Sequence, residues 1–170
     1  MNAELKNNLK FAITFKNMRT TETSGLLLFE RVLLLKSLPL FADTPETILA
    51  EMAHLMEEVE IGEGTDIVKE GEAGNCMYII YHGEIKIHKE QQLLAVLGEN
   101  NFFGELSLLD TETRSATATA LKDCILFRID QDPFYDLLES RPEVVRSIMK
   151  ILCQRLRGAN EQIAGLRNNS

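Results

Sequence analysis

The chain has 170 residues, of which 45% are hydrophobic, and it carries a formal net charge of −8. A chain of this length and composition can bury the core of one domain with appended elements. Its acidic balance argues against a nucleic-acid partner, because phosphate contacts need clustered lysine and arginine side chains.

The cysteines and the longest apolar segment indicate in which part of the cell the protein is expected. Cys76, Cys124 and Cys153 have no CxxC spacing and lie in apolar runs, so we expect buried free thiols in a reducing, cytoplasmic environment. The apolar segment 26–40 is interrupted by charged residues, so we expect no insertion into a membrane.

The N-terminal third predicts a polar arm and two helices. Residues 1–24 are polar and mixed, and we interpret them as an arm or linker. A mostly apolar helix is expected from Ser24 or Gly25 onward, and Pro39 ends it. A second helix should follow, with Thr44 as its N-cap and Pro45 as its first helical residue.

From about residue 58 the apolar period changes from helical to two, which indicates short strands. Glycines punctuate these strands, a pattern typical of a small, mainly β, antiparallel roll of the jelly-roll kind. The expected strand segments are 59–61, 67, 77–81, 85–87, 93–97, 117–121 and 125–129. We therefore expect one domain over 25–167, with helices at 25–56, the β-roll at 57–130 and C-terminal helices at 131–167.

Two helices are expected after the roll. Asp130 is a plausible N-cap for a short helix, and Pro142 opens a long one that runs to about Gly165. Apolar residues of the long helix follow a seven-residue repeat typical of a coiled-coil seam. They are Val145, Met149, Leu152, Leu156, Ala159, Ile163 and Leu166. The stripe predicts either a dimer seam or packing on the roll, and both can hold along different parts of the helix.

The segment 102–117 concentrates the chemistry that suits a sugar phosphate. It begins with an aromatic strand end, and Gly104 then allows a sharp turn before a short apolar helical run. Free amides at the start of such a turn, around Gly104 to Ser107, favour an anion. Arg114 offers a planar fork of donors to a phosphate, and Glu105 can accept a hydrogen bond from a sugar hydroxyl.

This segment resembles the phosphate-binding cassette of the cyclic nucleotide-binding domain family, of the catabolite-activator and protein-kinase regulatory-subunit type. The match covers Phe103, Gly104, Glu105, Leu106, Ser107, Leu108, Arg114, Ser115, Ala116 and Thr117. The sequence departs at Thr113, where the family often has proline. Weaker similarity in the turns and in the entry before the second helix extends the resemblance to about residues 25–160.

The resemblance implies roles for individual residues. The cyclic phosphate should be held by the amides of Gly104, Glu105, Leu106 and Ser107 together with Arg114, and Ser115 would add a hydroxyl. Glu105 should take the ribose 2′-hydroxyl. Phe103 and Met77 are expected as apolar walls. Asn160, on the last helix, is a candidate for reading the base edge.

The resemblance also implies an allosteric, non-catalytic sensor. The expected ligand is cAMP, with cGMP as the alternative, since Ser115 after the arginine does not decide between them. The signal should leave through the last helix, to a second copy of the chain or to an attached effector domain. The alternative is a degenerate domain that keeps the fold and acts in protein interaction or dimerisation.

Other functions fit the sequence less well. His54, His82 and His88 lack the spacing of a metal site, and no nucleophile pattern stands out, so we expect neither a metal nor an enzyme. A catabolite-activator-like DNA reader would need a helix-turn-helix after the last helix, and we expect none because the sequence ends at Ser170.

Overall fold

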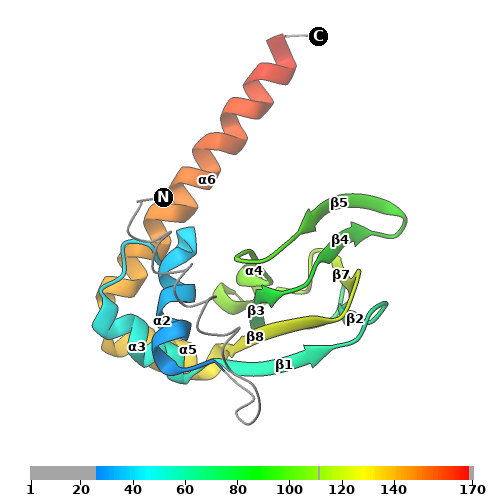
Figure 1. Ribbon diagram of the computed structural model, residues 1–170. Helices are drawn as coiled ribbons and strands as arrows, with labels where there is room; N and C mark the ends of the chain where they lie inside the picture. Colours follow the sequence, from blue (N-terminus) through cyan, green and yellow to red (C-terminus); the bar gives the residue numbers. More distant parts are fainter. Residues whose placement is uncertain (1–25, 111, 169–170) are drawn as a thin grey trace, which may run out of the picture.

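Short alternating strands form two antiparallel sheets in a computed structural model, which describes residues 26–110 and 112–168 (Figure 1). The strands are β1 (Glu57–Ile61), β2 (Asp66–Val68), β3 (Cys76–His82), β4 (Ile85–Lys89), β5 (Gln92–Leu97), β6 (Phe102–Phe103), β7 (Thr117–Ala120) and β8 (Cys124–Asp130). One sheet has the order β1-β8-β3-β6 and the other β2-β7-β4-β5. The predicted antiparallel β-roll with flanking helices is confirmed.

Helices precede β1 and follow β8, and one short helix lies between β6 and β7. They are α2 (Leu28–Ser37), the 3₁₀ turn η1 (Pro39–Phe41), α3 (Glu46–His54), α4 (Glu105–Leu109), α5 (Gln131–Ser140) and α6 (Pro142–Asn168). Helix α2 begins at Leu28, later than expected, and α6 ends at Asn168 rather than near Gly165. The predicted arm 1–24 lies outside the described residues.

The predicted N-cap of α3 is wrong. Pro45 takes that position with an extended ψ of 143°, so the helix begins at Glu46. Thr44 is instead fully buried, and its hydroxyl has no hydrogen-bond partner among the described residues. The prediction of Pro45 as the first helical residue is wrong as well, because the fixed φ of proline also suits the extended residue just before the helix.

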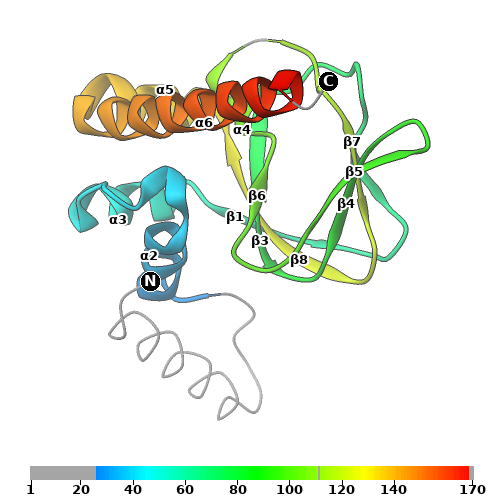
Figure 2. The ribbon, with the colours of Figure 1, turned by 90° about the horizontal axis from the view of Figure 1, so that it is seen from above.

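The side chains of β3 and β8 point alternately to the two faces of their sheet, and each face borders its own apolar core. Cys76 and Tyr78 point into the space between the two sheets, where they meet the small side chains of β7. Met77 and Ile79 point to the other face and join the helices in an outer core. Figure 2 shows this arrangement, with the helices on one side of the sheet that contains β3 and β8, and with β4, β5 and β7 on the far side. The two cores share this sheet as a wall.

Residues in the first half of helix α6 anchor it to the outer core. Val144 and Ile148 are buried there, and Lys150 forms an ion pair with Asp43 next to η1. The second half projects beyond the rest of the molecule (Figure 1). Among the described residues, no helix is long and apolar enough to cross a membrane.

The apolar stripe of α6 is divided between packing and exposure. Leu152 packs against the outer core, whereas Val145, Met149 and Leu156 are exposed. The repeat therefore includes side chains that remain accessible at the surface of this chain. Cys153 on the same helix is exposed as well, so the prediction of three buried thiols is correct for Cys76 and Cys124 and wrong here. Its neighbour Leu152 faces the outer core, whereas Cys153 lies on the exposed side of the helix.

Candidate functional site

Arg114 is a buried cation, and the residues just before and within β3 fix its position. Its backbone N–H donates to the carbonyl oxygen of Glu72 at 2.8 Å, and its own carbonyl accepts from the N–H of Gly71 at 2.9 Å. The guanidinium donates from Nη1 to the Cys76 carbonyl oxygen at 2.9 Å and from Nη2 to Cys76 Sγ at 3.2 Å. The side chain is only 6% exposed. No ion pair of Arg114 occurs among the described residues, so a buried positive charge lacks a carboxylate there.

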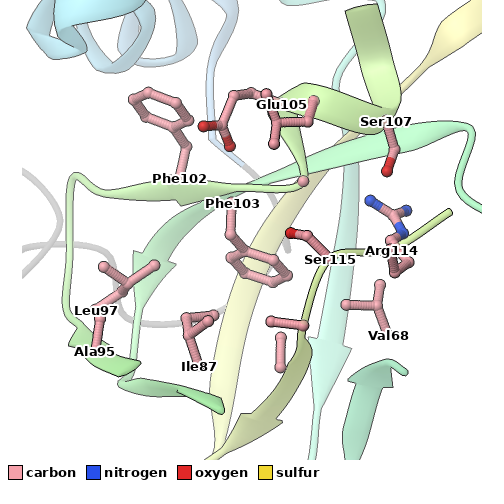
Figure 3. A pocket seen from close by; sticks show the side chains of 14 residues that line it. Val68, Ile87, Ala95, Leu97, Phe102, Phe103, Glu105, Ser107, Arg114 and Ser115 are labelled. Atoms are coloured by element: carbon pink, nitrogen blue, oxygen red, sulfur yellow. The ribbon is translucent and has the colours of Figure 1, made fainter. Parts of the chain in front are cut away.

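Two glycines leave room around this guanidinium. A Cβ atom on Gly74 would lie 2.5 Å from both Arg114 Nε and Ser107 Oγ, and a Cβ atom on Gly104 would lie 2.5 Å from Arg114 Nη1. Gly104 also has a φ of +80°, a left-handed conformation that favours glycine. Gly74, Gly104, Ser107 and Arg114, which we call the cradle, therefore meet at close quarters. In Figure 3 the hydroxyl of Ser107 points toward the guanidinium of Arg114.

A pocket of about 260 Å³ opens beside the cradle, between the two sheets. Its polar groups come from α4 and from the start of the segment before β7, namely Glu105, Ser107, Arg114 and Ser115. Its apolar lining comes from alternate positions of the second sheet, from β6 and from the residue before β7, namely Val68, Ile87, Ala95, Leu97, Phe102, Phe103, Ala116 and Ala118. Polar groups at one end and an apolar chamber at the other suit a ligand with a charged head and a flat, less polar body.

Phe103 forms the wall at the inner side of the pocket. It is buried and stacks on Tyr78, with ring centroids 5.2 Å apart. Burial, followed by the nearby Cys76 thiol, raises the pKa of Tyr78 to about 12. The phenol is therefore neutral over the ordinary pH range and provides no negative charge to Arg114.

The structure brings most of the residues expected from the cassette to this one pocket. Gly104, Glu105, Leu106 and Ser107 line it with Arg114 and Ser115. Glu105 is half-buried, whereas Leu106 and Ser115 are exposed at the rim. In Figure 3 the Glu105 carboxylate points away from the Arg114 guanidinium, so the two can address different parts of one ligand.

Two expected residues lie elsewhere. Met77 is fully buried in the outer core and does not line the pocket, because neighbouring residues of a strand face opposite sides and Tyr78 takes the inward position. Asn160 is exposed on the projecting part of α6 and does not line the pocket either. The anchoring of the first half of α6 directs this helix away from the roll.

Sequence reasoning missed Gly74, Cys76 and the small residues of the pocket floor. Cys76 and Arg114 are 38 positions apart, and their contact depends on how β3 faces the segment before β7. The floor could have been found from the alternation in β4, β5 and β7, which leaves small or aliphatic residues on the inner face. Among the described residues, no group of histidine, cysteine and acidic side chains could hold a metal ion.

Comparisons with known proteins agree on one family. Residues 58–141 match the cyclic nucleotide-binding domain. The CRP-like cAMP-activated global transcriptional regulator of Mycobacterium tuberculosis is 29% identical over 132 residues, which cover 75% of this chain and 59% of that protein. The chain thus spans about three fifths of the length of this curated relative.

Solved structures extend the similarity to the fold. The N-terminal domain of a transcriptional regulator from Streptomyces coelicolor is 33% identical with a TM-score of 0.69, and the match covers 76% of this chain and 93% of that one. The regulatory domain of Toxoplasma gondii PKA, solved with cAMP, is 30% identical with a TM-score of 0.63 and coverages of 68% and 46%. The family match over residues 58–141 contains the cassette, the cradle and the pocket, and the chain belongs to the cyclic nucleotide-binding domain family.

Proposed function

We propose that the protein is a non-catalytic cyclic nucleotide sensor, with the phosphate on the cradle and the base in the apolar part of the pocket. The observation that carries the proposal is the buried guanidinium of Arg114 without a carboxylate partner among the described residues. A buried charge is costly unless it is paired. A cyclic phosphate carries a single negative charge, which one guanidinium can balance in a geometry that suits both groups.

The rest of the cradle supports an anion at this position. Gly74 and Gly104 allow close approach to Arg114, and Ser107 offers a hydroxyl donor next to it. Ser115 at the rim would add a second hydroxyl, and the amides of Gly104 to Ser107 would face the same phosphate. Glu105, on the other side of the opening, would accept the 2′-hydroxyl of the ribose.

Among cyclic nucleotides we favour cAMP. The relative from M. tuberculosis is described as cAMP-activated, and the structure from T. gondii contains cAMP. The site does not use a metal in this proposal. The expectation of no nucleic-acid partner contrasts with the name of the M. tuberculosis relative, a transcriptional regulator, and stays a prediction.

The signal would leave through α6. Val145, Met149 and Leu156 form an exposed apolar stripe on this helix, which suits the seam of a homodimer. Contact of Asn160 with the base would require α6 to move toward the pocket, or a second copy to supply the residue.

Calorimetric titration with cAMP and cGMP tests the proposal. Arg114→Ala should weaken binding roughly 100-fold, since hydrogen bonds to charged groups contribute up to ~3 kcal/mol. Lys122→Ala is the matched control, because it also removes one positive charge but the lysine is exposed and pairs with Glu84. The assignment of the pocket is wrong if folded Arg114→Ala binds like the wild type. If the wild type binds neither nucleotide, the chain fits the degenerate interaction module instead.

A further inference from the structure

Side chains of α5 hold the C-terminal end of α4. The side-chain amide nitrogen of Gln131 lies 3.2 Å from the carbonyl oxygen of Ser107, 3.3 Å from that of Leu108 and 3.2 Å from that of Asp110. The hydroxyl of Tyr135 donates to the carbonyl oxygen of Leu109 at 2.8 Å. The last carbonyls of a helix have no partner within it, so these two side chains satisfy groups that α4 leaves open.

Gln131 also contacts the opposite side of the cradle. Its backbone N–H donates to the carbonyl oxygen of Asn75 at 2.8 Å, and Asn75 is the residue between Gly74 and Cys76. One residue at the start of α5 therefore bonds both segments that surround Arg114. The amide has two hydrogens for three carbonyl acceptors, so α4 can shift slightly while the amide keeps two bonds.

Helix α4 needs such support because it has five residues. A helix this short is not stable on its own. Its position decides where Ser107 lies relative to Arg114, since both are within 2.5 Å of the Cβ position of Gly74. Leu108 and Leu109 also pack against the outer core, but these apolar contacts leave the carbonyl groups at the end of α4 to be satisfied by other residues.

Helix α5 also connects the cradle to the long helix α6. Phe134 of α5 is fully buried in the outer core, together with Val144 and Ile148 of α6. A displacement of α6 would therefore move α5, and α5 is bonded to α4 through Gln131 and Tyr135. The route from the pocket to α6 is continuous and consists of contacts between described residues.

We propose that Gln131 and Tyr135, which we call the α4 clamp, are positioning residues that set the nucleotide affinity of the cradle and connect it to α6. The inference rests on the proposed function for the identity of the ligand. By linkage, whatever binds α6 and displaces α5 changes nucleotide affinity through the clamp, and nucleotide binding changes the affinity for that partner by the same factor.

Amide hydrogen exchange in the nucleotide-free protein of 170 residues tests the clamp independently of the ligand. Tyr135→Phe removes one oxygen and should accelerate exchange of the α4 amides about fivefold, the factor expected for one ordinary hydrogen bond. Gln131→Met should accelerate it more, because it removes the contacts to three carbonyls. Ser140→Ala is the control, since that hydroxyl bonds to Leu137 within α5 and should leave α4 unchanged. Unchanged α4 exchange in both clamp variants would overturn the proposal.

Affinity for cAMP gives the second measurement. Tyr135→Phe and Gln131→Met should each weaken binding about fivefold or more, although neither residue lines the pocket. Gln131→Lys should restore most of the affinity lost in Gln131→Met, because an ammonium donates to the same carbonyls at a helix C-terminus. A merely structural role predicts lower melting temperatures with unchanged affinity, and that result would overturn the clamp. If wild-type protein binds no nucleotide, the proposed function fails, while α4 exchange still decides on the clamp.

Discussion

Gly74 shows how one missing side chain can matter for a site. Its φ lies outside the left-handed region, so alanine fits the backbone, but the new Cβ would lie 2.5 Å from atoms of Arg114 and Ser107. We expect Gly74→Ala to weaken nucleotide binding at least about tenfold, which corresponds to ~1.4 kcal/mol, with little change in the fold. Calorimetric titration measures the loss.

Gly98 provides the matched control for that substitution. A Cβ atom there would have no neighbour within 4 Å, and its φ is not positive either. Gly98→Ala should therefore bind like the wild type. Equal affinities for both alanine variants would mean that the ligand does not depend on the space beside Arg114.

Glu105 allows a test that uses a change in the ligand. Glu105→Gln should weaken the binding of cAMP, because a neutral amide accepts a weaker hydrogen bond from the ribose than a carboxylate does. The same substitution should matter less for 2′-deoxy-cAMP, which already lacks the hydroxyl. Titration of the wild type and of Glu105→Gln with each of the two ligands gives the four affinities that are needed for the comparison. Equal losses with the two ligands would remove Glu105 from the ribose.

Among the individual residues of the candidate site, the sequence predicted those that belong to one continuous motif. Glu105, Ser107 and Arg114 lie within ten positions and meet at one pocket, as expected. Gly74 and Cys76 come from a distant segment, which the antiparallel bridge between Ala73 and Thr113 brings to Arg114. Met77 faces the outer core instead of the pocket, because the face of a strand to which a residue points depends on its exact register.

Among the elements, the strands were predicted best and the helix ends worst. Alternation and glycine turns located the strands of both sheets, because each strand has one face that must be apolar. Thr44 was misplaced because capping preferences of neighbouring residues compete, and Pro45 took the cap. Whether the stripe on α6 packs or dimerises also depended on the tertiary structure, since Leu152 meets the outer core and Met149 does not.

The exposed apolar stripe on helix α6 predicts how one substitution affects dimerisation. Leu156 is 63% exposed, so Leu156→Glu should leave the monomer folded but place two carboxylates in the proposed seam. We expect the dissociation constant of the dimer to rise at least about tenfold, since charges at core positions of a coiled coil are destabilising. Light scattering over a series of protein concentrations measures this shift.

Gln154 is the control on the same helix. It is exposed and falls outside the seven-residue repeat, so Gln154→Glu adds the same charge away from the seam. This variant should dimerise like the wild type. A Leu156→Glu protein that dimerises normally would place the interface on another surface.

For the molecule as a whole, stability should depend on alkaline pH through Tyr78. Its pKa is raised to about 12, from 10.0, because burial disfavours the phenolate. A raised pKa in the folded state means that the contribution to stability is complete below pH 10 and is lost as the pH rises toward 12. The free energy of unfolding should therefore fall across this window.

Tyr78→Phe separates this effect from the titration of other groups. Phenylalanine keeps the stacking on Phe103 but cannot ionise, so the decline between pH 10 and pH 12 should be less steep than in the wild type. Urea unfolding at pH 8 and pH 11 gives the comparison. Parallel curves for the two proteins would contradict the buried phenol as the source.

The division of β3 between two cores has a consequence for how such a protein can diverge. Substitutions at Cys76, Tyr78 or Ile80 alter the core between the sheets, which supports Arg114 and the Phe103 wall of the pocket, whereas substitutions at Met77 or Ile79 alter the surface that meets the helices. Ligand preference and the choice of downstream partner can therefore be acquired by separate mutations on a single strand. Duplicated copies of this gene could specialise in one property while inheriting the other intact.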